Sequence, residues 1–181
     1  MAGKATTSTI FIEHLSVICQ QDAIAALEDG GIGSGDIVVL RGLGPKGGPG
    51  MGFASWFTAA LSGTGLASEV AVLTDGQLSG LNRGLTIGQI TPEAAAGGPI
   101  SLVIDGDRIT IDLDARSVHL DQDAEELDRR RRNWRPPQHG RERGWLAIYE
   151  QTVQSLAQGA VLGARHRPAA ADPRPEHPEG M

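Results

Sequence analysis

Hydrophobic positions along the chain follow two different patterns. Residues 37–40 (IVVL) and 70–73 (VAVL) are short, uninterrupted apolar runs, which are typical of strands buried on both faces of a parallel sheet. Residues 21–29 and 53–61 instead carry apolar side chains at helical spacing, and glycines follow each segment. Because these helical and extended segments alternate along the chain, the pattern predicts an α/β domain.

Weaker patterns predict the remaining elements. Two apolar segments, residues 100–104 and 108–113, flank Asp105 and Gly106, a dipeptide that favours a β-hairpin turn. Thr91 is expected to cap a short helical turn that has Pro92 in its first position. The other predicted elements are extended segments at 9–12, 15–18, 85–90 and 118–120, the helical turn itself at 94–96, and helices at 123–134 and 145–156.

The domain organisation follows from where periodicity stops. Residues 1–9 are polar and are expected to be flexible, and residues 163–181 lack any period and are expected to be disordered. This leaves one domain at residues 10–162. A chain of 181 residues is long enough for a single domain of this kind with its own core.

Composition excludes several classes of function. A net charge of −6 and a pI near 5.3 disfavour nucleic acid and membrane surfaces as partners. No signal peptide or membrane-spanning run is visible, so a cytoplasmic protein is expected. Cys19 is the single cysteine, and no pair of histidines has the spacing of a metal site. The sequence therefore predicts neither a disulfide, nor a metal, nor a cofactor held by this chain alone.

Two glycine-rich segments follow the two buried strands. The first glycine loop is residues 44–51 (GPKGGPGM), and the second glycine loop is residues 73–84 (LTDGQLSGLNRG). In α/β sheets, ligands bind beyond the carboxyl ends of the strands, where such loops lie. Glycines let the backbone approach a ligand closely, and the first loop lacks the G-K-[ST] ending of a nucleotide-binding loop. We therefore expect its N–H groups to cradle a carboxylate or enolate oxygen of a substrate.

The second loop supplies the candidate catalytic groups. Ser79 is its best-placed hydroxyl, Asp75 either holds the turn or handles a proton, and Arg83 suits a carboxylate. A histidine of near-neutral pKa would serve as the base, with His14 preferred over His139. The predicted substrate contacts come from both loops and the helix between them: Gly47, Gly48, Met51, Phe53, Trp56, Gln77, Asn82 and Arg83.

Three separate motifs in one order carry a family resemblance: GDIVVLRGLGPKGGPGM, VAVLTDGQLSGLNRG and ITPEAAAGGPISLVIDGDRITIDLDAR. They resemble the C-terminal domain of dihydroxy-acid dehydratases and of the related sugar-acid dehydratases. The resemblance implies a swivelling β/β/α domain, with a barrel-like mixed sheet and flanking helices. Enzymes of this family remove water from 2,3-dihydroxy acids. They use an iron–sulfur cluster held by a large N-terminal domain and a nearby magnesium ion, and Ser79 matches their alkoxide base.

This chain departs from the family pattern in ways that bear on function. The N-terminal domain with its cluster cysteines is absent, Phe53 stands where a magnesium-ligating glutamate is expected, and Gln89 replaces a histidine. With Trp56 on the same helix, the site should accept a large, apolar substrate. We therefore interpret the chain as a metal- and cluster-independent lyase or cyclase of specialised, polyketide-type metabolism. It would eliminate water from a β-hydroxy-carbonyl substrate, with conjugate-addition ring closure as a following step.

Two alternatives remain open from the sequence. The chain is the small subunit of a two-chain iron–sulfur dihydroxy-acid dehydratase, with a cluster-bearing large subunit as its partner. Otherwise it is a non-catalytic binding module that keeps only the fold. A homodimer is the expected assembly in the first interpretation.

Overall fold

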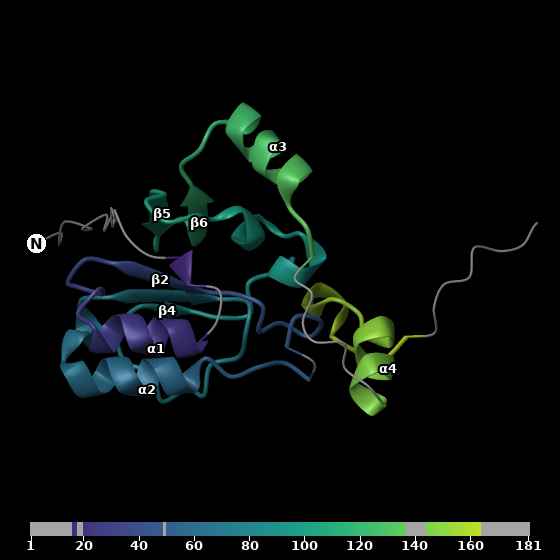
Figure 1. Ribbon diagram of the computed structural model, residues 1–181, viewed down its shortest axis with the longest axis horizontal. Helices are drawn as coiled ribbons and strands as arrows, with labels where there is room; N and C mark the ends of the chain where they lie inside the picture. The colour runs from purple at the N-terminus through teal and green to yellow at the C-terminus, as the bar shows by residue number, and fades with distance from the viewer. Residues whose placement is uncertain (1–15, 18–19, 49, 137–143, 164–181) are drawn as a thin grey trace, which may run out of the picture.

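A four-stranded parallel sheet forms the centre of the molecule. The structure, a computed structural model, describes residues 16–17, 20–48, 50–136 and 144–163. The strands are β1 (Ser16–Val17), β2 (Ile37–Leu40), β3 (Ala71–Thr74) and β4 (Thr86–Ile87), in the order β1-β2-β3-β4 (Figure 1). All neighbouring strands are parallel. The predicted strands at 37–40 and 70–73 are thus confirmed to within one residue.

Every residue of β2 and β3 is buried, which explains their uninterrupted apolar sequences. The two strands pair from Ile37 opposite Ala71 to Leu40 opposite Thr74. Successive side chains of a strand point to opposite faces. Val38 therefore packs in the cluster under the helices, whereas Ile37 and Val39 pack in a second cluster on the other face.

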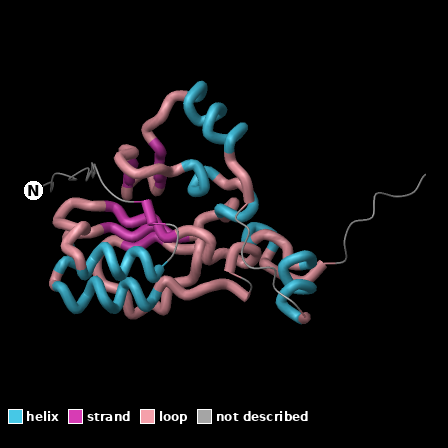
Figure 2. Tube along the Cα trace, in the orientation of Figure 1, coloured by secondary structure: helices cyan, strands magenta, loops and turns pink. Residues whose placement is uncertain are grey.

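Two helices cover one face of the sheet. Both helices lie against the same face of the strands (Figure 2). Helix α1 (Gln20–Glu28) contributes Ala23 and Leu27 to the core, and α2 (Ser55–Thr64) contributes Phe57 and Leu61. Gly65 ends α2 in the left-handed conformation at φ 83°, which glycine adopts without strain. Both helices lie within one or two residues of their predicted starts.

A small antiparallel hairpin, β5 (Ile109–Asp112) and β6 (Ser117–Leu120), covers the opposite face. It packs there with two 3-10 turns, η2 (Ala94–Ala96) and η3 (Pro99–Leu102). Hairpin, sheet and helices thus form three layers of β, β and α (Figure 1). The mixed α/β class is confirmed. Among the described strands no barrel closes, so the barrel-like part of the prediction is not confirmed.

The predicted hairpin around Asp105 and Gly106 is wrong. Its first arm is the turn η3, which begins with Pro99 at a position that suits a helical start. The Nη1 atom of Arg41 donates to the carbonyl oxygens of Ile100, Ser101 and Val103, at 3.3, 3.1 and 2.7 Å. These carbonyls are therefore satisfied by a side chain instead of by a neighbouring strand. The cap of η2 is Glu93 and not the predicted Thr91.

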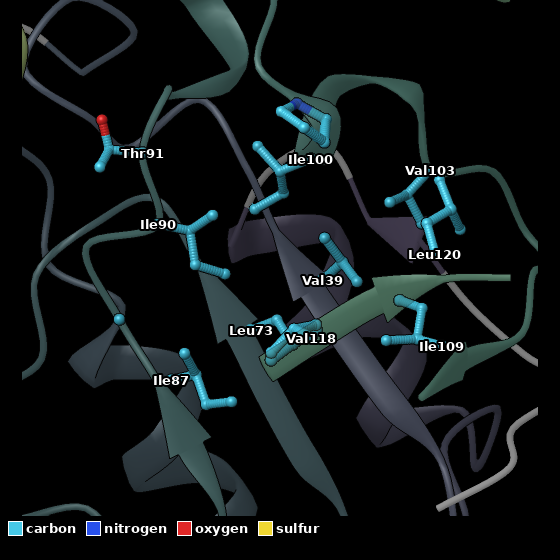
Figure 3. A pocket seen from close by; sticks show the side chains of 12 residues that line it. Val39, Leu73, Ile87, Ile90, Thr91, Ile100, Val103, Ile109, Val118 and Leu120 are labelled. Atoms are coloured by element: carbon cyan, nitrogen blue, oxygen red, sulfur yellow. The ribbon is translucent and has the colours of Figure 1, made fainter. Parts of the chain in front are cut away.

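The sheet and the hairpin do not fill the space between them. A cavity of about 380 Å³ lies there, lined by aliphatic side chains that include Val39, Leu73, Ile87 and Val118 (Figure 3). The space is open to solvent on one side, where Val118 of β6 is 41% exposed.

The C-terminal elements are attached to this core from outside. Helix α3 (Ala124–Asn133) buries none of its residues, starts at the Asp123 cap, and is held by an ion pair between Arg130 and Asp107. The short helix η1 (Leu66–Ser68) follows α2, and α4 (Trp145–Thr152) and η4 (Leu156–Gln158) end the described chain. Helix α4 is shorter than predicted, and Val153 is the buried residue behind it. Among the described helices, none is long and apolar enough to cross a membrane.

Candidate active-site loops

The two glycine loops lie side by side at the carboxyl ends of β2 and β3. The N–H of Gln77 donates to the carbonyl of Gly52 at 2.9 Å, and the N–H of Ala54 donates to the carbonyl of Gln77 at 3.0 Å. Phe53 and Gln77 thereby form a parallel bridge between the loops. Gln20 at the start of α1 fixes the same point, because its Nε2 donates to the Phe53 carbonyl at 2.6 Å. The sequence prediction that these loops form one site is consistent with this arrangement.

The carboxylate of Asp75 connects three segments of this region. Its side chain is wholly buried at the end of β3. Oδ1 accepts the N–H of Leu43 at 2.9 Å, and Oδ2 accepts those of Gly42 and Ala94 at 3.1 and 2.9 Å. One carboxylate therefore joins the ends of β2 and β3 to the start of η2. This gives Asp75 a complete structural role inside the fold, and its predicted contact with a substrate proton stays a prediction.

Glu93 holds the middle of the first loop in the same way. It is 4% exposed, and its carboxylate accepts the N–H groups of Lys46 and Gly47 at 3.0 and 2.9 Å. Burial raises the pKa of Glu93, while the two N–H groups act in the opposite direction. Gly44 has to be glycine here, because an added Cβ would lie 2.4 Å from Oε2 of Glu93.

The backbone cradle predicted for a substrate is thus occupied by the chain itself. The N–H groups of residues 42, 43, 46 and 47 bind Asp75 and Glu93, and those of 48, 51 and 52 bind loop carbonyls. The prediction named the right chemistry, carboxylate on backbone N–H, but the carboxylates are internal. Sequence reasoning missed Glu93. Its signal was an acid between Pro92 and Ala94, which opens an otherwise apolar turn.

The second loop has the opposite character at its tip. Ser79 is exposed, and its Oγ accepts the N–H of Leu81 at 3.3 Å. Arg83 is exposed as well and forms no ion pair with any described residue. Asn82 donates from Nδ2 to the Thr86 hydroxyl at 3.4 Å, while its buried Oδ1 has no partner among the described atoms. The groups free to meet a ligand are therefore on this loop.

The remaining candidates flank this tip or lie elsewhere. Phe53 is 50% exposed and Trp56 is 75% exposed, so both rings are accessible at the start of α2. Gly47 is buried, and Gly48 and Met51 are half-buried within the first loop, where Met51 takes a positive φ of 69°. His14 and His139 lie outside the described residues. Among the described candidates, the structure brings together those on the two glycine loops.

The cluster and the metal implied by the family resemblance do not fit the described residues of this chain. No group of three or more His, Cys, Asp or Glu side chains gathers there. Asp75 and Glu93, the carboxylates of the two loops, are buried and bonded to backbone N–H groups. Phe53 offers a phenyl ring. Ligands for such groups would have to come from another part of an enzyme.

Comparison with known proteins decides the family. A family model described as "Dihydroxy-acid/6-phosphogluconate dehydratase C-terminal" matches residues 6–160. The chain belongs to this family. Similar curated proteins, all named dihydroxy-acid dehydratase, come from Clostridium kluyveri (48% identity over 144 residues), Geotalea daltonii (50% over 145) and Pyrobaculum aerophilum (49% over 142). Each match covers 78–80% of this chain and 25–26% of the relative.

This dehydratase family membership corrects the interpretation drawn from Phe53. Relatives at nearly half identity carry the name dihydroxy-acid dehydratase, and none of those three is named a cyclase or an enzyme of polyketide metabolism. The predicted polyketide-type cyclase with a metal-independent mechanism is therefore wrong, whereas the coarser prediction of a dehydratase-like carbon–oxygen lyase agrees with the names of these relatives. The exchange at Phe53 does not indicate the class of substrate, because it changes a single side chain at a position that is fixed by its backbone. The chain spans about a quarter of the length of the curated relatives it matches.

Proposed function

We propose that this chain forms the C-terminal part of a dihydroxy-acid dehydratase and contributes one wall of its active site. The carrying observation is the pair of joined loops, in which buried carboxylates fix the backbone while Ser79 and Arg83 remain exposed. An enclosed site needs a second wall, since Ser79 lies at the surface. The chain matches only about a quarter of the length of its relatives. This supports a cluster-bearing large unit as the part that supplies the second wall.

The roles of the chain's own residues follow from their positions. In the proposed elimination, Ser79 acts as its alkoxide and takes the C2 proton next to the substrate carboxylate, the C3–O bond breaks, and the departing hydroxyl takes up that proton and leaves as water, while the resulting enol becomes a 2-keto acid. The Leu81 N–H already donates to Ser79 Oγ at 3.3 Å, which helps to fix the position of the hydroxyl. Arg83, four residues further along the loop, would bind the substrate carboxylate.

The test is a chimera in which this chain replaces the matched 144 residues of the Clostridium kluyveri relative. It is assayed for conversion of a 2,3-dihydroxy acid to the corresponding 2-keto acid. We expect turnover that falls at least about 100-fold on Ser79→Ala, while a matched Ser68→Ala variant in η1 keeps full activity. Turnover unaffected by Ser79→Ala would refute the role of Ser79. A folded chimera without any turnover would argue against a catalytic part.

A non-catalytic dehydratase-like unit is the second candidate, and Phe53 favours it. The half-exposed ring lies at the bridge between the loops, at the position where the family resemblance leads us to expect a glutamate. Phe53→Glu in the chimera separates the two cases. Activity that appears only with Phe53→Glu would show that the natural chain binds without turning over. Activity already present with Phe53 excludes this candidate.

A further inference from the structure

One residue beside the two glycine loops carries a side chain where the backbone favours glycine. Gln89 has a positive φ of 57°, in the left-handed region where a Cβ atom causes strain. The residue is exposed, and its carboxamide forms no hydrogen bond with any residue that the structure describes. Neither burial nor hydrogen bonding within the described chain therefore accounts for a glutamine here. A strained residue that the fold does not need is a candidate for a functional contact.

Backbone hydrogen bonds place Gln89 at the base of the second glycine loop. Its N–H donates to the carbonyl of Gly76 at 2.9 Å, and the N–H of Ile90 donates to the carbonyl of Thr74 at 3.1 Å. These bonds continue the pairing of β4 with β3 beyond the last residue of β4. Gln89 therefore lies at the carboxyl end of the sheet, next to the loop segment that forms the bridge to the first glycine loop.

Side-chain packing brings the part of the loop that carries Ser79 close to Gln89. A Cβ atom added to Gly88 would lie 2.8 Å from Cδ1 of Leu78. The residue before Ser79 thus packs directly on the residue before Gln89. The exposed hydroxyl and the exposed carboxamide therefore belong to neighbouring segments of the same surface.

We propose that the carboxamide of Gln89 binds a hydroxyl group of the dihydroxy-acid substrate. A carboxamide can donate to a hydroxyl oxygen and accept a hydrogen bond from an O–H, so it suits a hydroxyl in either orientation. In the proposed function Arg83 binds the carboxylate and Ser79 takes the C2 proton, which leaves the hydroxyls without a partner on this chain. This inference rests on the proposed function, because it takes the substrate to be a 2,3-dihydroxy acid.

The thermal stability of this chain tests whether the fold needs the glutamine. Gln89→Gly removes the strained Cβ atom, so we expect the Tm to rise by about 2–4 °C. Arg116→Gly is the matched control, because Arg116 is also exposed, has a φ of 53°, and lies in the turn between β5 and β6. It should raise the Tm by a similar amount. A Tm that falls with Gln89→Gly and rises with Arg116→Gly would show that the glutamine supports the fold, which would overturn the proposal.

Equilibrium binding tests the contact with the substrate. The chimera is used with Ser79→Ala, so that bound substrate is not consumed, and a 2,3-dihydroxy acid is titrated into it in a calorimeter. We expect the Kd to be weakened at least about tenfold by Gln89→Gly and by Gln89→Met, which keeps the side-chain length but lacks the carboxamide. Gln89→Asn keeps the carboxamide and tolerates the left-handed conformation, so it should bind more tightly than either. Arg116→Gly should leave the Kd unchanged, and an unchanged Kd for the Gly and Met variants of Gln89 would refute the proposal.

The two proposals fail in distinguishable ways. If the chimera turns over substrate but neither Gln89 variant weakens binding, the function stands and the role of Gln89 is wrong. If both variants weaken binding but no chimera turns over substrate, Gln89 stands as a binding residue and the catalytic role of Ser79 is wrong. A folded chimera that binds no dihydroxy acid would overturn both proposals.

Discussion

The first glycine loop and the two residues before it turn amide groups inward toward Glu93 and Asp75, whereas the tip of the second loop leaves Ser79 and Arg83 at the surface. Both loops are glycine-rich and both leave adjacent parallel strands. The difference is that a buried carboxylate reaches the backbone of the first loop, and no such group reaches the tip of the second. Glycine content alone therefore does not mark a ligand-binding loop, since glycine also admits a protein's own carboxylate.

Removing the central carboxylate should break this contrast most strongly. We expect Asp75→Ala to lower the free energy of unfolding by roughly 3–5 kcal/mol, because three backbone N–H groups lose their acceptor in the interior. Urea denaturation measures the change. Ser79→Ala is the control on the second loop and should change stability by less than about 0.5 kcal/mol. Similar losses for both variants would mean that the loops are equally structural.

Adding a methyl group probes the same contrast through packing. Gly44→Ala should lower the free energy of unfolding by about 2–3 kcal/mol, because its Cβ would displace the Glu93 carboxylate. Gly80→Ala in the second loop meets open space and should cost only about 1 kcal/mol, from its positive φ of 81°. Thermal unfolding followed by circular dichroism gives both values. A larger loss at Gly80 would reverse the assignment of the tight and the open loop.

The smallest expected effect comes from removing the charge of Glu93, the carboxylate that binds the first loop. Glu93→Gln should lower stability by about 1 kcal/mol, because an amide N–H₂ group then faces the Lys46 N–H. The pKa of Glu93 is raised by burial, so the folded state holds its proton more tightly than the unfolded chain does. The stability advantage of the wild type over Glu93→Gln should therefore decrease as the pH rises from 4 to 7. Urea titrations at several pH values measure it, and an advantage that grows with pH would contradict the raised pKa.

Elements with one dominant signal could be predicted from sequence. The runs at β2 and β3 are apolar because both faces of the sheet are covered, and the acidic start and basic end of α3 match its dipole. The segment at Ile100 failed, because its apolar residues suit a strand or a buried turn equally. Arg41 stabilises the turn by donating hydrogen bonds to its carbonyls. A contact between residues about sixty positions apart leaves no local pattern in the sequence.

The adjacency of the two loops could be predicted from the sequence, whereas the contacts of their individual residues could not. Strand order brings the two loops together, and the resemblance pointed to Ser79. Whether a loop carboxylate faces inward or outward depends on which amides surround it in the fold, so Asp75 and Ser79 could not be separated in advance. Glu93 was missed for the same reason, because its partners Lys46 and Gly47 are nearly fifty residues away.

The ties of the first loop run from side-chain carboxylates to main-chain amides, and this has an evolutionary consequence. An amide N–H is the same for every residue type except proline, so Asp75 and Glu93 can hold the loop whatever side chains stand at its accessible positions, although buried positions such as Gly44 admit only glycine. Substitutions at accessible positions such as Phe53 can then accumulate by drift without weakening the fold. A lineage can exchange the chemistry at the rim of this loop while inheriting its shape intact.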